Sequence, residues 1–146
     1  MRFRSVEVLI LTFPGERVEP LAVEALRGVV EMGDVTLLDV VFVSRDPHGD
    51  LRVLEFADGG ELFGFSDVEV AGRDLLNDED IAIVAETLEA GSSAVVIAYE
   101  NTWVRRVSEA IGEAGGQVAL NVLIPSETAD DALRAVEEAD RTRGNR

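Results

Sequence analysis

The chain has 146 residues, 47 % of them apolar, and a net charge of −16. This length fits one domain, and the apolar fraction can supply a core without disulfides or a structural metal. The chain has no cysteine, which excludes thiol catalysis and fits a reducing compartment. The negative charge disfavours nucleic acids and anionic membrane surfaces as partners. We therefore expect a cytoplasmic protein that binds no nucleic acid.

The N-terminal sequence "MRFRSVEVLILTFPGERVEP" places two arginines before an apolar run, as a signal peptide does. The run is short, contains Glu7 and ends without a small-residue cleavage site. We interpret residues 6–13 as a first strand, and its nearly continuous apolar composition predicts a central strand covered on both faces. No stretch approaches the roughly 20 apolar residues of a membrane span.

The next elements alternate in type. Apolar residues at helical spacing predict a helix over 19–32, with Gly33 after its end. A long strand is expected at 35–45, and "DPHGD" predicts a tight turn into a returning strand at 51–56. Residues 57–76 contain four glycines and no clear period, so we expect a loop with one short helix.

The second half begins with a helix whose start is clearly marked. Asn77 is predicted to be its N-cap, with Asp80 three residues later, in a capping box. A later helix, which begins near residue 102, is predicted to pack its apolar face against the sheet. Further helices and strands are expected in the order helix 77–90, strand 93–99, helix 102–114, strand 117–124 and helix 126–142.

Two parts of the chain have the same pattern. Residues 6–43 and 94–125 both give a strand, a break, a helix, glycine and a strand, and "LDVV" at 38–41 aligns with "LNVL" at 120–123. The pattern predicts an α+β fold, a ferredoxin-like split β-α-β sandwich with two β-α-β repeats and extra helices. Its five strands would form one mostly antiparallel sheet with the helices on one face. We expect one domain over 1–142 and a disordered tail at 143–146.

A small doubly wound parallel sheet is the alternative, and the hairpin at 45–51 argues against a purely parallel sheet.

Four stretches carry a family resemblance: "FPG", "LLDVVFVSRDPHGD", "LNDEDIAIVAETLEAGSSAVVIAYENTW" and "AGGQV". Over about residues 5–135 the chain resembles an uncharacterised actinobacterial family, known only as a domain of unknown function. It is also similar to a broader bacterial family labelled membrane protein of unknown function. Those relatives often have a Gly-rich apolar insert before the acidic helix, where this chain has its partly charged segment 57–76. The membrane label therefore does not carry over.

Several residues suggest chemistry but have simpler explanations. The only histidine, His48, lies in the predicted turn, and a single histidine makes a transition-metal site improbable. The acidic run 78–80 suits the first turn of a helix and lacks calcium-loop spacing. We expect no metal and no cofactor. Asp39 and Asn121 occupy matching positions in apolar runs, where they could pair across the sheet, face a cleft, lie on a partly solvated face or lie at an interface.

The strongest candidate site is "AYENTWVRRV", residues 98–107. Asn101 or Thr102 is expected to cap the following helix, and Trp103 to pack against the sheet. The two adjacent arginines lie near a helix N-terminus, where positive charge is unfavourable. Either an internal carboxylate or a bound anion would offset them. The candidate ligand-binding residues are Glu100, Asn101, Trp103, Arg105 and Arg106.

No catalytic constellation is recognisable: no glycine-rich phosphate loop, no nucleophile elbow and no serine beside a base. We therefore expect a non-enzymatic protein acting through self-association, as a homodimer or higher oligomer, or through an unidentified protein partner. The alternative is a binder of an anionic or aromatic small molecule, or a cofactor-poor enzyme of the dimeric α+β barrel type. Its pocket mouth would then lie near Tyr99, Glu100 and Trp103.

Overall fold

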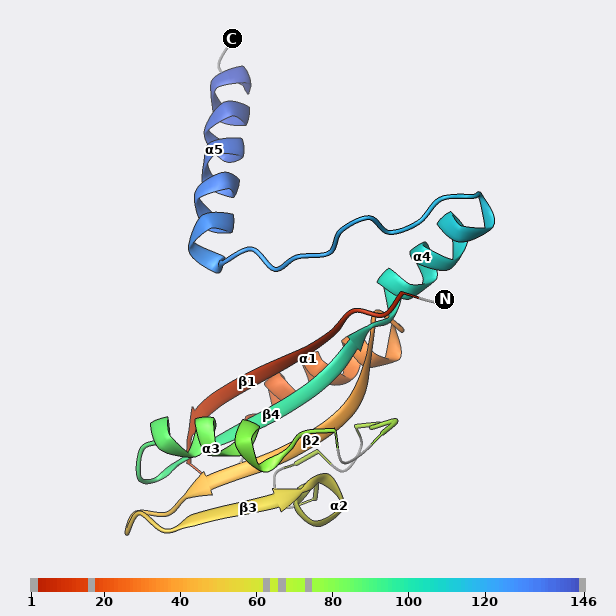
Figure 1. Ribbon diagram of the computed structural model, residues 1–146. Helices are drawn as coiled ribbons and strands as arrows, with labels where there is room; N and C mark the ends of the chain where they lie inside the picture. The colour runs from red at the N-terminus through yellow and green to blue at the C-terminus, as the bar shows by residue number, and fades with distance from the viewer. Residues whose placement is uncertain (1–2, 16–17, 62–63, 66–67, 73–74, 145–146) are drawn as a thin grey trace.

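The computed structural model describes residues 3–15, 18–61, 64–65, 68–72 and 75–144 (Figure 1). One sheet contains every strand formed by these residues, in the order β1-β4-β2-β3, and all neighbouring strands are antiparallel. The α+β class is confirmed, whereas the ferredoxin-like strand order is not. The expected fifth strand, 117–124, is wrong, because these residues pair with no strand in the described structure. The strands are β1 (Val6–Pro14), β2 (Val35–Arg45), β3 (Leu51–Glu55) and β4 (Ser92–Asn101).

The helices agree with the predicted ones to within a few residues. The capping box of the acidic helix is confirmed: the Asn77 side chain accepts from the Asp80 N–H at 3.0 Å, and the Asp80 side chain accepts from the Asn77 N–H at 3.0 Å. The tight turn is confirmed too, because Asp46 Oδ1 accepts the N–H groups of His48 and Asp50, each at 2.9 Å. The helices are α1 (Pro20–Glu31), α2 (Phe56–Gly59), α3 (Asp78–Thr87), α4 (Thr102–Glu113) and α5 (Ser126–Gly144).

The sheet is covered on both faces, so the expectation of helices on one face is wrong. On one face Val23 of α1 packs with residues of β2 and β4 that include Phe42 and Ile97. On the other face Val84 of α3 packs with residues that include Val41 and Val96. The alternating side chains of β2 and β4 therefore bury both of their faces, which accounts for their nearly continuous apolar sequences.

The segment after α2 carries the chain from one face to the other. Phe65 belongs to the α1-side core and Leu76 to the α3-side core. Between them, the Ala71 N–H donates to the Leu37 carbonyl at 2.8 Å, beside an irregularity in the β2–β4 pairing. The expected loop with one short helix is confirmed for the described residues of 57–76, which form no helix or strand other than α2.

Asp39 fixes the end of this crossing. It is only 2 % exposed, and its Oδ2 accepts the backbone N–H groups of Leu75 and Leu76 at 2.9 and 2.8 Å. Two hydrogen bonds to a buried carboxylate satisfy a group that would otherwise be costly to bury. Asp39 therefore holds the approach to α3, and its burial rules out the partly solvated sheet face considered from sequence.

β1 differs from the strand expected from sequence. It lies at one edge of the sheet rather than in the centre. Leu9 and Leu11 are opposite Ile97 and Val95 of β4 on the α1-side face, while Ile10 is opposite Val96 on the α3-side face. Val6, Val8, Leu9, Ile10 and Leu11 are 41 to 53 % exposed. The apolar residues of this strand are therefore available on both faces.

The chain after β4 has little contact with the sheet. α4 continues past the end of the sheet, and the following segment and α5 lie apart from the sheet (Figure 1). Among the described residues from 103 to 144, none is buried. The predicted inner face of α4 is wrong, because Trp103, Val107 and Ile111 are 43 to 53 % exposed.

Candidate functional site

The candidate site contains a buried carboxylate. Glu100 lies near the end of β4, opposite Val6 of β1 and Thr36 of β2, and is 2 % exposed. Arg4 Nη1 donates to its Oε2 at 3.0 Å, and Arg105 Nε donates to the same oxygen at 3.2 Å. Two guanidinium groups thus balance one buried negative charge, as a buried ion requires.

Arg105 has an intramolecular explanation. Besides Glu100 it lies 3.8 Å from the Glu109 carboxylate, one turn along α4. Of the two alternatives that the sequence leaves open, the structure provides the internal carboxylate. Glu100 also lies just before the N-terminal end of α4, where the helix dipole favours a negative charge.

A second polar cluster lies on the neighbouring residues of the same strands. Tyr99 Oη donates to Glu7 Oε2 at 2.5 Å, and Asn101 Nδ2 donates to Glu7 Oε1 at 3.0 Å. The hydrogen bond to Glu7, together with burial and the negative charge of Glu7, raises the pKa of Tyr99 to about 12. Asn101 also donates to Ser5 Oγ at 3.3 Å. Asn101 occupies the predicted N-cap position of α4, but its side chain makes no capping hydrogen bond there.

Trp103 and Arg106 do not join these clusters. Trp103 is 53 % exposed, so its predicted packing against the sheet is wrong. Arg106 lines a hollow of about 160 Å³ with Gly33, Glu69 and Thr102. A Cβ atom on Gly33 would lie 3.0 Å from Arg106 Nη2, so the glycine makes room for the guanidinium. Ligand binding by the five candidate residues stays a prediction. Trp103 and Arg106 are the two whose side chains are exposed to solvent.

Sequence reasoning missed the β1 side of the site. Arg4, Ser5 and Glu7 provide the partners of Glu100, Tyr99 and Asn101, although they lie more than 90 residues away in sequence. Only the antiparallel pairing of β1 with β4 could have revealed these residues, because it brings the start of β1 to the end of β4. Without knowledge of that pairing, Glu7 appears only as an irregularity in an apolar run.

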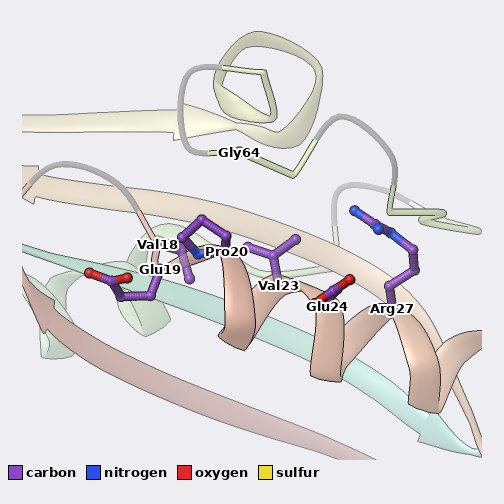
Figure 2. A pocket seen from close by; sticks show the side chains of 7 residues that line it. All are labelled: Val18, Glu19, Pro20, Val23, Glu24, Arg27 and Gly64. Carbon is purple, nitrogen blue, oxygen red and sulfur yellow. The ribbon is translucent and has the colours of Figure 1, made fainter.

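Another hollow lies elsewhere, between the first half of α1 and Gly64 (Figure 2). Its volume is about 620 Å³, within the range of small-molecule sites. Val18, Pro20 and Val23 provide apolar lining, and Arg27 points across from α1 in Figure 2. Glu19 and Glu24 complete the lining. This hollow is separate from the residues singled out by sequence.

Comparison with known proteins identifies the family. A family of unknown function, DUF6325, matches residues 2–138. The chain belongs to this family. No curated protein and no solved structure matches it. The membership of this DUF6325 chain gives no reaction or ligand, so its chemistry has to be inferred from its own residues.

Two properties of the DUF6325 chain bear on its possible roles. Within the described residues, no helix is both long and apolar enough to cross a bilayer. In the same part of the chain, no group of three or more His, Cys, Asp or Glu side chains is arranged to hold a metal ion. The observations that remain for function are the exposed apolar surfaces of β1, α4 and the segment after it.

Proposed function

We propose that this protein acts through self-association, as a homodimer or higher oligomer, and not as an enzyme. The observation that carries the proposal is β1, an edge strand whose apolar residues are exposed on both faces. Exposed apolar edge strands promote pairing with other chains unless they are covered. A strand such as β1 is therefore a contact surface.

The surfaces after β4 extend the apolar area. Trp103, Val107 and Ile111 lie four residues apart along α4, so they share one exposed face of the helix. In the segment 117–124, Leu120 and Leu123 are 79 and 76 % exposed. Single exposed apolar residues are ordinary, whereas a helix face and two extended segments together indicate a protein interface.

The proposal includes the ferredoxin-like arrangement. Such a sheet requires one more strand beside β1, antiparallel to it, so that two split β-α-β units interleave. Residues 117–124 have the composition of that strand and pair with no strand in the part of the chain that the structure describes. Association that supplies a strand at this edge would complete the predicted topology.

Light scattering combined with gel filtration tests the proposal. We expect a dimer or larger species at micromolar concentration. Leu9→Glu adds a charge at the proposed contact and should raise the dissociation constant at least about 30-fold, because a leucine contributes roughly 2 kcal/mol when buried and each 1.4 kcal/mol is about tenfold. Leu51→Glu, on the opposite edge strand β3 and similarly exposed, is the matched control. A strict monomer, or equal effects of both variants, contradicts the proposal.

A second candidate function is binding of a small molecule in the hollow beside α1. Its volume and its combination of apolar lining with Arg27 support this candidate. Ligands that raise the melting temperature of the wild-type chain but not of Val23→Trp, which fills the hollow, would support it. If no compound in a metabolite screen shifts the melting temperature, the candidate fails.

We also expect the protein to act in the cytoplasm, since a chain without cysteine needs no oxidising compartment. Fractionation of cells expressing a tagged full chain tests the location, and recovery in the membrane or secreted fraction contradicts it.

A further inference from the structure

We infer that two copies of this chain exchange residues 102–124 reciprocally, so that segment 117–124 of each copy pairs with the open edge of β1 in the other. This inference rests on the self-association proposed above and specifies how it occurs. We call residues 117–124 the arm. The exchange is supported by the hinge between β4 and α4, by the match between the arm and the edge of β1, and by the charge of both.

The hinge is the first observation. β4 ends at Asn101 and α4 begins at Thr102, with no residue between them. In the first repeat, by contrast, residues 15–19 separate β1 from α1, and α1 folds back over the sheet. A helix that continues directly from a strand projects beyond the end of the sheet, as α4 does in Figure 1.

Contacts on both sides of the hinge hold this direction. Thr102 Oγ1 lies 2.5 Å from Thr36 Oγ1, and the Trp103 N–H donates to the Asp34 carbonyl at 3.3 Å. The ion pair between Glu100 and Arg105 also spans the junction. Folding α4 back over its own sheet would break all three contacts. Short hinges of this kind favour exchange between copies over closure within one chain.

The arm matches the edge of β1. In the alignment of the two repeats, residues 6–43 and 94–125, β1 corresponds to β4 and β2 corresponds to the arm. Val40 of β2 pairs with Ile97 of β4, and the same register in the second repeat places Val122 opposite Leu9. The apolar residues Val118, Leu120, Val122 and Ile124 alternate along the arm, so they would share the α1-side face with Leu9 and Leu11.

The direction of the arm favours a second copy as the partner. Within one chain the arm reaches β1 at the start of the strand, where Asn121 Nδ2 donates to Ser5 Oγ at 3.4 Å. It approaches from beyond the end of the sheet, so continuing along its own β1 would make it parallel, unlike every other pair in the sheet. An arm arriving from a second copy related by a two-fold axis has no such constraint.

The charges also agree with strand addition between copies. Each chain carries a net charge of −16, so contact between two acidic surfaces would be repulsive. Residues 117–125, "QVALNVLIP", contain no charged side chain. Glu7 is the one charged residue of β1, and Tyr99 and Asn101 already donate to it. The arm and the edge are therefore the parts of two acidic chains that can meet without repulsion.

Disulfide trapping tests the exchange, because the chain has no native cysteine. In the double variant Leu9→Cys/Val122→Cys, mild oxidation should convert most of the protein to a covalent dimer on a non-reducing gel. The pair Leu11→Cys/Leu120→Cys, in the same register, provides a second variant should the first fail to fold. The control is Arg52→Cys/Val122→Cys on the opposite edge strand, which should give no dimer above the level of single-cysteine variants.

Each outcome has a distinct meaning. A disulfide within one chain overturns the exchange, as does dimer formation through Arg52→Cys. A dimer in light scattering whose two test pairs form no disulfide also overturns it, while self-association stands. A monomer contradicts both proposals.

Lengthening the hinge gives an independent measurement. Inserting Gly-Ser-Gly between Asn101 and Thr102 should let α4 turn back, so that the oxidised double variant forms its disulfide within one chain and elutes as a monomer. An insertion variant that folds and still forms the intermolecular disulfide as fully as before contradicts the role assigned to the hinge.

Discussion

The two β-α-β repeats share a sequence pattern but differ in structure. In the first, α1 folds back over the sheet, and β2 is flanked by β4 and β3. In the second, α4 projects away, and residues 117–124 join no strand in the described structure. The repeats differ in their connections, five residues (15–19) in one and none in the other. Sequence periodicity thus predicts the helices and strands. The length of the connection between strand and helix decides whether the helix packs on the sheet of its own chain.

The largest expected difference in the free energy of unfolding is between Phe42 and Ile124, which occupy matching positions in the two repeats. Phe42 is fully buried between Phe56 and Phe65, so Phe42→Ala should lower the free energy of unfolding by about 3–5 kcal/mol at any protein concentration. Ile124 occupies the same position in the second repeat and is 63 % exposed within the chain. Ile124→Ala should matter only where copies associate.

Urea unfolding at two protein concentrations separates these effects. An equal loss for Ile124→Ala at high and low concentration would mean that the arm packs within its own chain.

The next contrast concerns the polar residue of each repeat. Asp39→Ala leaves the N–H groups of Leu75 and Leu76 without their acceptor, and we expect a loss of about 2–3 kcal/mol, with faster hydrogen exchange at both amides. Asn121→Ala removes one long hydrogen bond at the surface and should change stability by less than about 0.5 kcal/mol. Equal effects would contradict the structural role assigned to Asp39.

A smaller effect is expected at the junction of the second repeat. Glu100→Gln keeps the size of the side chain but removes the charge between Arg4 and Arg105, and should destabilise the fold by about 1–3 kcal/mol. Asp131→Asn is the control, because its 3.5 Å pair with Arg134 is exposed on both sides and contributes little. Thermal unfolding of both variants measures the difference, and a neutral Glu100→Gln would show that the ion pairs do not hold the junction.

The smallest expected effect is a pH dependence. Tyr99 is the only tyrosine, so absorbance at high pH reports its titration alone, with an expected pKa of about 12. Glu7→Gln should move this pKa towards 10. Because the pKa of Tyr99 is higher in the folded chain than in the unfolded chain, its contact with Glu7 stabilises the fold fully below pH 10. This contribution, about 1 kcal/mol after solvent screening, is lost between about pH 10 and 12. Wild-type titration near 10 in the folded chain would contradict the contact with Glu7.

Local sequence signals predicted most of the elements. Asn77 with Asp80 marked the start of α3, and the turn at His48 was clear from proline and glycine. The environment of each element was less predictable. "VEVLILTF" has the composition of a buried strand, yet β1 lies at an edge, because composition does not reveal whether a neighbouring strand is present.

The candidate site was predictable on one strand only. Glu100 and Arg105 stand out because their charges lie at a strand-to-helix junction. Their partner Arg4 comes from the other end of the chain, and only the β1–β4 register brings it close. Trp103 was expected to be buried because of its size, but the straight junction directs it away from the sheet.

The edge position of β1 has a consequence during synthesis. The four strands of the described structure all precede the arm in the sequence, since β4 ends at Asn101. At roughly 5–20 residues per second, the ribosome needs about 1–5 s to add residues 102–124. For that interval the nascent chain presents the apolar edge of β1 before its own arm exists, and a chaperone or a finished copy of the protein meets that edge first.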